Sequence, residues 1–130
     1  MALHDATLPH LRWELYQRWK SYGDGNAIVS SNDDKTSYCQ LVRQVESKYA
    51  ALSNNELQAR EVVALGDAMG VEMVATLVAC WLRGLTVVLV DGSQPEARRR
   101  RLLGIAAPSL IVDHDGEVAR GVANARHCIY

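Results

Sequence analysis

The sequence predicts an α/β fold: a parallel sheet from βαβ units, with an N-terminal helix and a short hairpin. Two observations lead to this prediction. From residue 61 onwards, short apolar runs alternate with longer helical patterns, in the order strand, helix, strand, helix, strand. That alternation is typical of right-handed βαβ crossovers, which place successive strands parallel. In addition, the run Leu85–Val90 is almost continuously apolar and rich in valine, as in strands that a parallel sheet buries on both faces.

The first part of the chain predicts a helix and a hairpin. Apolar residues recur at a spacing of three and four, at Leu8, Leu11, Leu15 and Trp19. This spacing is typical of an amphipathic helix, and the glycine-containing segment 21–26 ends it. Residues 27–29 then read as a short strand, and residues 36–38 pair back with it as a hairpin arm.

The remaining elements follow from periodicity and from helix-end signals. The predicted ranges are 38–52 (helix), 61–66 (strand), 71–83 (helix), 85–90 (strand), 95–106 (helix) and 109–112 (strand). The helix that begins at Val71 is apolar nearly all round, which predicts burial on several sides. Ser93 and Glu96 have the spacing of a capping box for the next helix. Beyond Asp113 the pattern weakens, and residues 117–130 are expected to form a short helix and a tail.

The predicted core combines the apolar faces of these elements. Its members are Ile28, Leu41, Val45, Val63, Leu65, Val74, Leu77, Trp81, Val88, Val90, Leu103 and Ile111.

Length and composition limit the classes of function. The 130 residues fit one domain that spans 1–130, with the tail 114–130 poorly defined. Apolar residues make up 48% and charged residues 22% of the sequence, as in soluble globular proteins. The formal net charge of −1 argues against nucleic acid and against an acidic membrane surface as partners.

The cysteines and the chain start point to a cytoplasmic protein. The three cysteines, Cys39, Cys80 and Cys128, are odd in number and lack C-x-x-C spacing, which favours reduced thiols. The N-terminus has no charged region followed by an apolar core, so no signal peptide is expected. The longest apolar stretch is interrupted by Glu72 and Arg83, so no membrane span is expected either.

A run of four arginines is the candidate interaction site. Arg98, Arg99, Arg100 and Arg101 follow one another within a predicted helix. On a helix they point in different directions, so they cannot all contact one ligand. Two interpretations remain: a solvated face whose side-chain stems cover apolar surface, or a docking patch for an acidic partner.

The sequence assigns no catalytic, cofactor-binding or metal-binding residues. The turn at residues 66–70 (Gly-Asp-Ala-Met-Gly) could present N–H groups to a phosphate. It matches neither G-x-G-x-x-G nor a P-loop, however, and predicts an ordinary glycine-assisted turn. His114 and His127 lack the companion ligands that a zinc site needs. Cys80 lies in the most apolar helix and is expected to be an inert core thiol.

The order of several short patterns resembles the N-terminal part of adenylate-forming (AMP-binding) enzymes, most closely nonribosomal peptide synthetase adenylation domains. Residues 36–41 (Thr-Ser-Tyr-Cys-Gln-Leu) are similar to that family's T-x-Y-x-x-L signature. Residues 60–65 (Arg-Glu-Val-Val-Ala-Leu) are similar to its G-D-x-V-A-L strand. Residues 72–84 are similar to its E-x-x-x-x-x-L-A-x-L-K-A-G helix. Residues 86–98 are similar to its A-Y-V-P-L-D-P-x-Y-P-x-E-R segment. Residues 11–113 follow the family order with hardly a gap.

The departures from the family pattern affect one loop and the chemistry. Leu89 and Gly92 replace two usual prolines, and Gln94 replaces the usual tyrosine. The family's phosphate loop ending in lysine, its later ATP-site motifs and its C-terminal catalytic lysine have no counterpart in these residues. The resemblance therefore implies the fold of part of the adenylation-domain N-terminal subdomain, without implying activity of the chain alone.

Three functions are compatible with this resemblance. The first is a non-catalytic or split adenylation fragment, which acts as a scaffold or interaction module in nonribosomal peptide or acyl-activating metabolism. Its partner would be the remaining adenylation-domain portion, or a second copy in a homodimer. The second is a truncated portion of a complete ATP-dependent amino-acid- or acyl-adenylating ligase. The third is a repurposed small binding module, such as a regulatory or substrate-pocket remnant.

Overall fold

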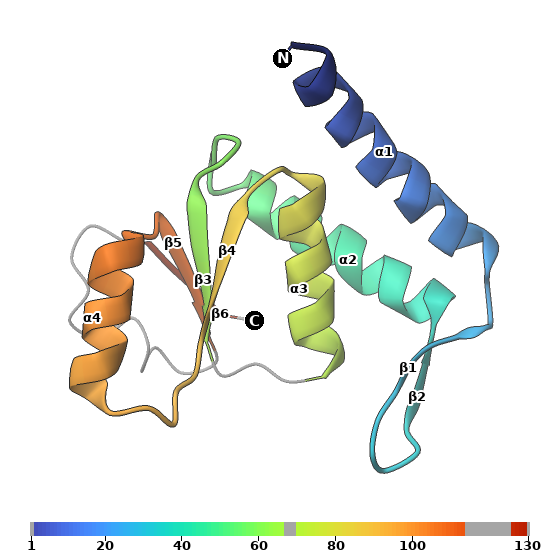
Figure 1. The fold of residues 1–130 in the computed structure, drawn as a ribbon. Helices are drawn as coiled ribbons and strands as arrows, with labels where there is room; N and C mark the ends of the chain where they lie inside the picture. The colour runs from blue at the N-terminus through green and yellow to red at the C-terminus, as the bar shows by residue number, and fades with distance from the viewer. Residues whose placement is uncertain (1, 67–69, 114–125, 130) are drawn as a thin grey trace.

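The computed structural model describes residues 2–66, 70–113 and 126–129. Its elements are α1 (Ala2–Ser21), β1 (Asn26–Val29), β2 (Lys35–Ser37), α2 (Tyr38–Ser53), β3 (Val62–Gly66), α3 (Val71–Leu82), β4 (Thr86–Val90), α4 (Glu96–Ala106), β5 (Leu110–Asp113) and β6 (Arg126–Ile129). β1 and β2 form a small antiparallel hairpin that lies away from the main sheet (Figure 1). None of the described helices is long and apolar enough to cross a membrane.

The main sheet has the strand order β4-β3-β5-β6, and its neighbouring strands are parallel. The three predicted strands near residues 61–66, 85–90 and 109–112 are therefore confirmed, as are the helices that connect them. β4 lies at one end of this order, and its outer edge pairs with no strand among the residues that the structure describes. The predicted α/β fold class is confirmed.

The expectation of a short helix and a tail at residues 117–130 is wrong for residues 126–129. These residues form β6, which pairs in parallel with β5: Leu110 lies opposite Arg126 at one end, and Asp113 lies opposite Ile129 at the other. The physical reason is the free edge of β5, whose backbone N–H and C=O groups require partners. A strand of four residues with little apolar periodicity gives no sequence signal of its own. The rest of the predicted tail lies outside the described residues.

Helices cover the two faces of the sheet unequally. α2 and α3 lie on one face, and α4 lies on the other (Figure 1). Strand side chains alternate between the two faces: Val63 and Leu65 pack into the larger core with α2 and α3, whereas Ala64 packs into a smaller core with Leu103 of α4. The sheet is thus the middle layer of the structure.

The predicted core is confirmed at seven positions and only half-buried at five. Leu41, Val45, Val63, Leu65, Val90, Leu103 and Ile111 are buried. Ile28, Val74, Leu77, Trp81 and Val88 are partly buried and pack against the core. Three of these five residues lie on α3, and Val88 lies on β4, the strand at one end of the sheet. Along α3 six residues are buried, five are partly buried and only Glu72 is exposed, so the expectation that this helix is buried on several sides is confirmed.

The predicted apolar face of α1 is wrong at Leu11 and Leu15 but holds at Trp19, which is partly buried and packs against the core. Leu11 and Leu15 are 45% and 44% exposed, while Tyr16 is 2% exposed. The helix packs on α2 through aromatic rings: Trp13 contacts Tyr49 edge-to-face, with ring centroids 5.6 Å apart. Tyr16 also donates a hydrogen bond to the Val42 carbonyl oxygen at 3.3 Å. Aromatic rings bury more area than leucine, so they decide which side of the helix faces inward.

Candidate functional site

The four candidate arginines all lie on α4 but have different surroundings. Arg98, Arg100 and Arg101 are exposed, and Arg99 is half-buried. Arg100 forms an ion pair with Glu96 one turn earlier, with Nη2 and Oε1 2.8 Å apart. Arg98 reaches back to Gln94 in the loop before α4, with Nη1 3.5 Å from Oε1. The structure therefore does not bring the four arginines together into one site.

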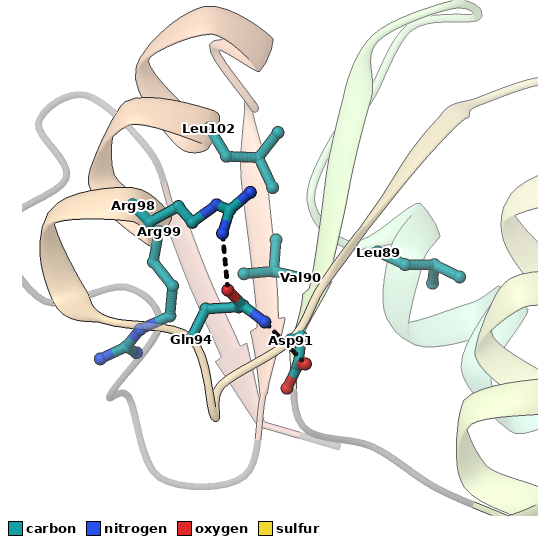
Figure 2. A pocket seen from close by; sticks show the side chains of 7 residues that line it. All are labelled: Leu89, Val90, Asp91, Gln94, Arg98, Arg99 and Leu102. Carbon is teal, nitrogen blue, oxygen red and sulfur yellow. Dashed lines mark hydrogen bonds between the residues drawn. The ribbon is translucent and has the colours of Figure 1, made fainter.

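Two of these arginines line a groove between α4 and the end of β4. Its volume is about 310 Å³, and it is lined by Arg98, Arg99 and Leu102 from α4 and by Leu89 and Val90 from β4, with the connecting loop between them. Figure 2 shows the Arg98 guanidinium, Leu102 and Val90 around the same space, with Leu89 pointing to the other side of the strand. The groove thus combines an apolar floor with cationic groups at its wall.

Asp91 organises the loop that closes one end of the groove. Its Oδ1 accepts hydrogen bonds from the Ser93 hydroxyl at 2.7 Å and from the Ser93 backbone N–H at 2.9 Å. Its Oδ2 lies 3.5 Å from the Gln94 side-chain nitrogen (Figure 2). The hydrogen bonds from Ser93, and then that from Gln94, lower the pKa of the Asp91 carboxyl below its ordinary value. The carboxylate therefore stays charged and is turned toward its own loop.

This loop corrects the prediction of a capping box at Ser93 and Glu96. The residue that caps α4 is Pro95, and no side-chain hydrogen bond is made to the cap in the described part of the chain. Ser93 bonds Asp91 instead, because an aspartate two residues earlier competes for the same hydroxyl and N–H groups. The Asp-x-Ser pattern directly after a strand is the signal that could have identified this turn.

The groove does not lie where open α/β sheets usually bind small ligands. Such ligands bind at the carboxyl ends of the strands, where the chain order reverses. In the order β4-β3-β5-β6 that point is between β3 and β5, whereas the groove lies beside the edge strand β4. The groove therefore does not coincide with the position at which open α/β sheets usually bind small ligands.

The other candidate positions do not form a site in the described residues. Gly70 precedes α3 with φ of 75°, a backbone conformation that favours glycine, but residues 67–69 of the predicted turn lie outside the described residues. His114 also lies outside them, and His127 is in β6, paired with Ile111. Cys80 is fully buried, which confirms the prediction that it lies in the core, and burial raises the pKa of its thiol to about 12.

Comparison with solved structures shows what this fold is similar to. CmiS6 superposes with a TM-score of 0.77 at 26% identity, over 92% of this chain and 30% of that protein. IdnL1 superposes with a TM-score of 0.71 at 25% identity, over 82% of this chain and 22% of that protein. The N-terminal subdomain of NpsA from Klebsiella oxytoca superposes with a TM-score of 0.77 at 23% identity, over 94% and 30%.

The chain spans less than a third of the length of each of these proteins. A comparison with curated proteins gives no significant match. A family profile described as "AMP-binding enzyme" matches residues 15–129. The fold corresponds to part of the N-terminal subdomain seen in NpsA. The predicted resemblance is thereby confirmed, and the chain belongs to the family of AMP-binding enzymes.

Proposed function

We propose that this chain is the scaffold portion of an adenylate-forming unit, which further polypeptide completes and supplies with its ATP chemistry. The observation that supports the proposal is the open end of the sheet. On β4, Thr86 and Leu89 are exposed, and Val87 and Val88 are only half-buried. A parallel sheet with this composition is normally covered on both faces, so an uncovered strand indicates that a further layer belongs there.

The ends of the central strands support the same proposal. β3 ends at Gly66 and β5 ends at Asp113, and both residues are buried. Neither Gly66 nor Asp113 has a cationic side chain that could bind a phosphate. Phosphoryl and nucleotidyl chemistry needs cationic groups and N–H donors positioned on the phosphates. In this proposal those groups come from the completing polypeptide, in a unit that serves nonribosomal peptide synthesis or another acyl-activating pathway.

The first test is ATP–pyrophosphate exchange. The purified 130-residue chain is expected to give no exchange above background with any of a panel of amino, aryl and fatty acids. Addition of the completing adenylation polypeptide should produce exchange that depends on both components. The control is the completing polypeptide alone. Exchange by the 130-residue chain on its own, free of contaminating enzyme, would overturn the proposal.

A second candidate is the scaffold portion of a single-chain adenylating ligase. The observation that favours it is the coverage: this chain matches only 22–30% of each of the three solved relatives. An immunoblot of the native source separates the two candidates. A band near 14.4 kDa supports a separate scaffold chain, whereas a band several times larger supports the single-chain ligase.

A further inference from the structure

We draw no further inference here: the strongest candidate, the groove between α4 and the end of β4 with the exposed side chains of Leu89 and Leu102 in its lining, is a surface for which nothing in the structure shows what covers it.

Discussion

The side chains of α4 show how neighbouring residues of one type acquire different roles. Arg98 and Arg99 line a groove, whereas Arg100 is engaged by Glu96 within the helix. Successive residues on a helix are rotated by about 100° from one another. The run of four therefore does not form one patch, and the position of β4 relative to α4 decides which arginines line the groove.

Cys80 provides a residue-scale prediction about pH. Its thiol is buried in the larger core, and burial raises its pKa from about 9 to about 12. Between these values the folded protein holds a proton that the unfolded chain has lost, so the free energy of unfolding falls as pH rises. The stabilising contribution is fully present below about pH 9.

Replacement of Cys80 by alanine tests this prediction. Urea unfolding of Cys80→Ala should give a free energy of unfolding that falls less steeply between about pH 9 and 11 than that of the unaltered chain. The buried Tyr16, whose pKa is also raised to about 12, is present in both proteins and cancels in the comparison. Parallel pH profiles for the two proteins would show that the Cys80 thiol titrates as it does in the unfolded chain.

Among the elements, α2 and α4 begin in different ways. Ser37 caps α2 in a complete capping box: its hydroxyl accepts from the Gln40 backbone N–H at 3.1 Å, and the Gln40 side chain accepts from the Ser37 N–H at 2.9 Å. α4 begins after Pro95 without such bonds in the described residues. The Ser37 and Gln40 side chains therefore stabilise the start of α2, whereas Ser93 belongs to the loop before α4.

Alanine substitutions at the two serines are expected to differ accordingly. Ser37→Ala should lower the free energy of unfolding by about 1 kcal/mol, a typical cost of removing an N-cap side chain. Ser93→Ala should cost less than about 0.5 kcal/mol, as most exposed surface substitutions do. Denaturant midpoints measured on both variants give the comparison. A larger loss for Ser93→Ala would mean that the turn around Asp91 contributes more to the fold than the α2 cap does.

The molecule as a whole has one well-covered side and one open end. α2, α3 and α1 pack together over one face of the sheet, while β4 leaves Leu89 exposed at the sheet edge. Native proteins usually protect such an edge with charges, bulges or covering segments. Without the completing polypeptide, we expect this edge to promote association of the chain with itself.

Light scattering at micromolar concentration tests that expectation. Leu89→Lys should shift the purified chain toward the monomer, because a lysine on the edge disfavours strand pairing. Leu11→Lys is the matched control: it makes the same change at an exposed leucine of α1, far along the chain from β4. Only Leu89→Lys should reduce the average mass. A monomeric unaltered chain, or equal effects of the two lysines, would contradict a role of the β4 edge.

The sequence by itself determined the order of elements as far as β5, the parallel sheet and the family. Local periodicity and glycine or proline boundaries contain that information: the valine-rich run of β4 and the helix from Val71 were predicted within a few residues. Tertiary structure alone decided the rest. In the folded chain, Tyr16 is buried on α1 instead of Leu11 and Leu15, and β6 pairs with β5. Arg98 and Arg99 line the groove, whereas Arg100 and Arg101 do not. The physical reason is that these outcomes depend on which residues distant in sequence come to lie beside one another, and no local pattern records that.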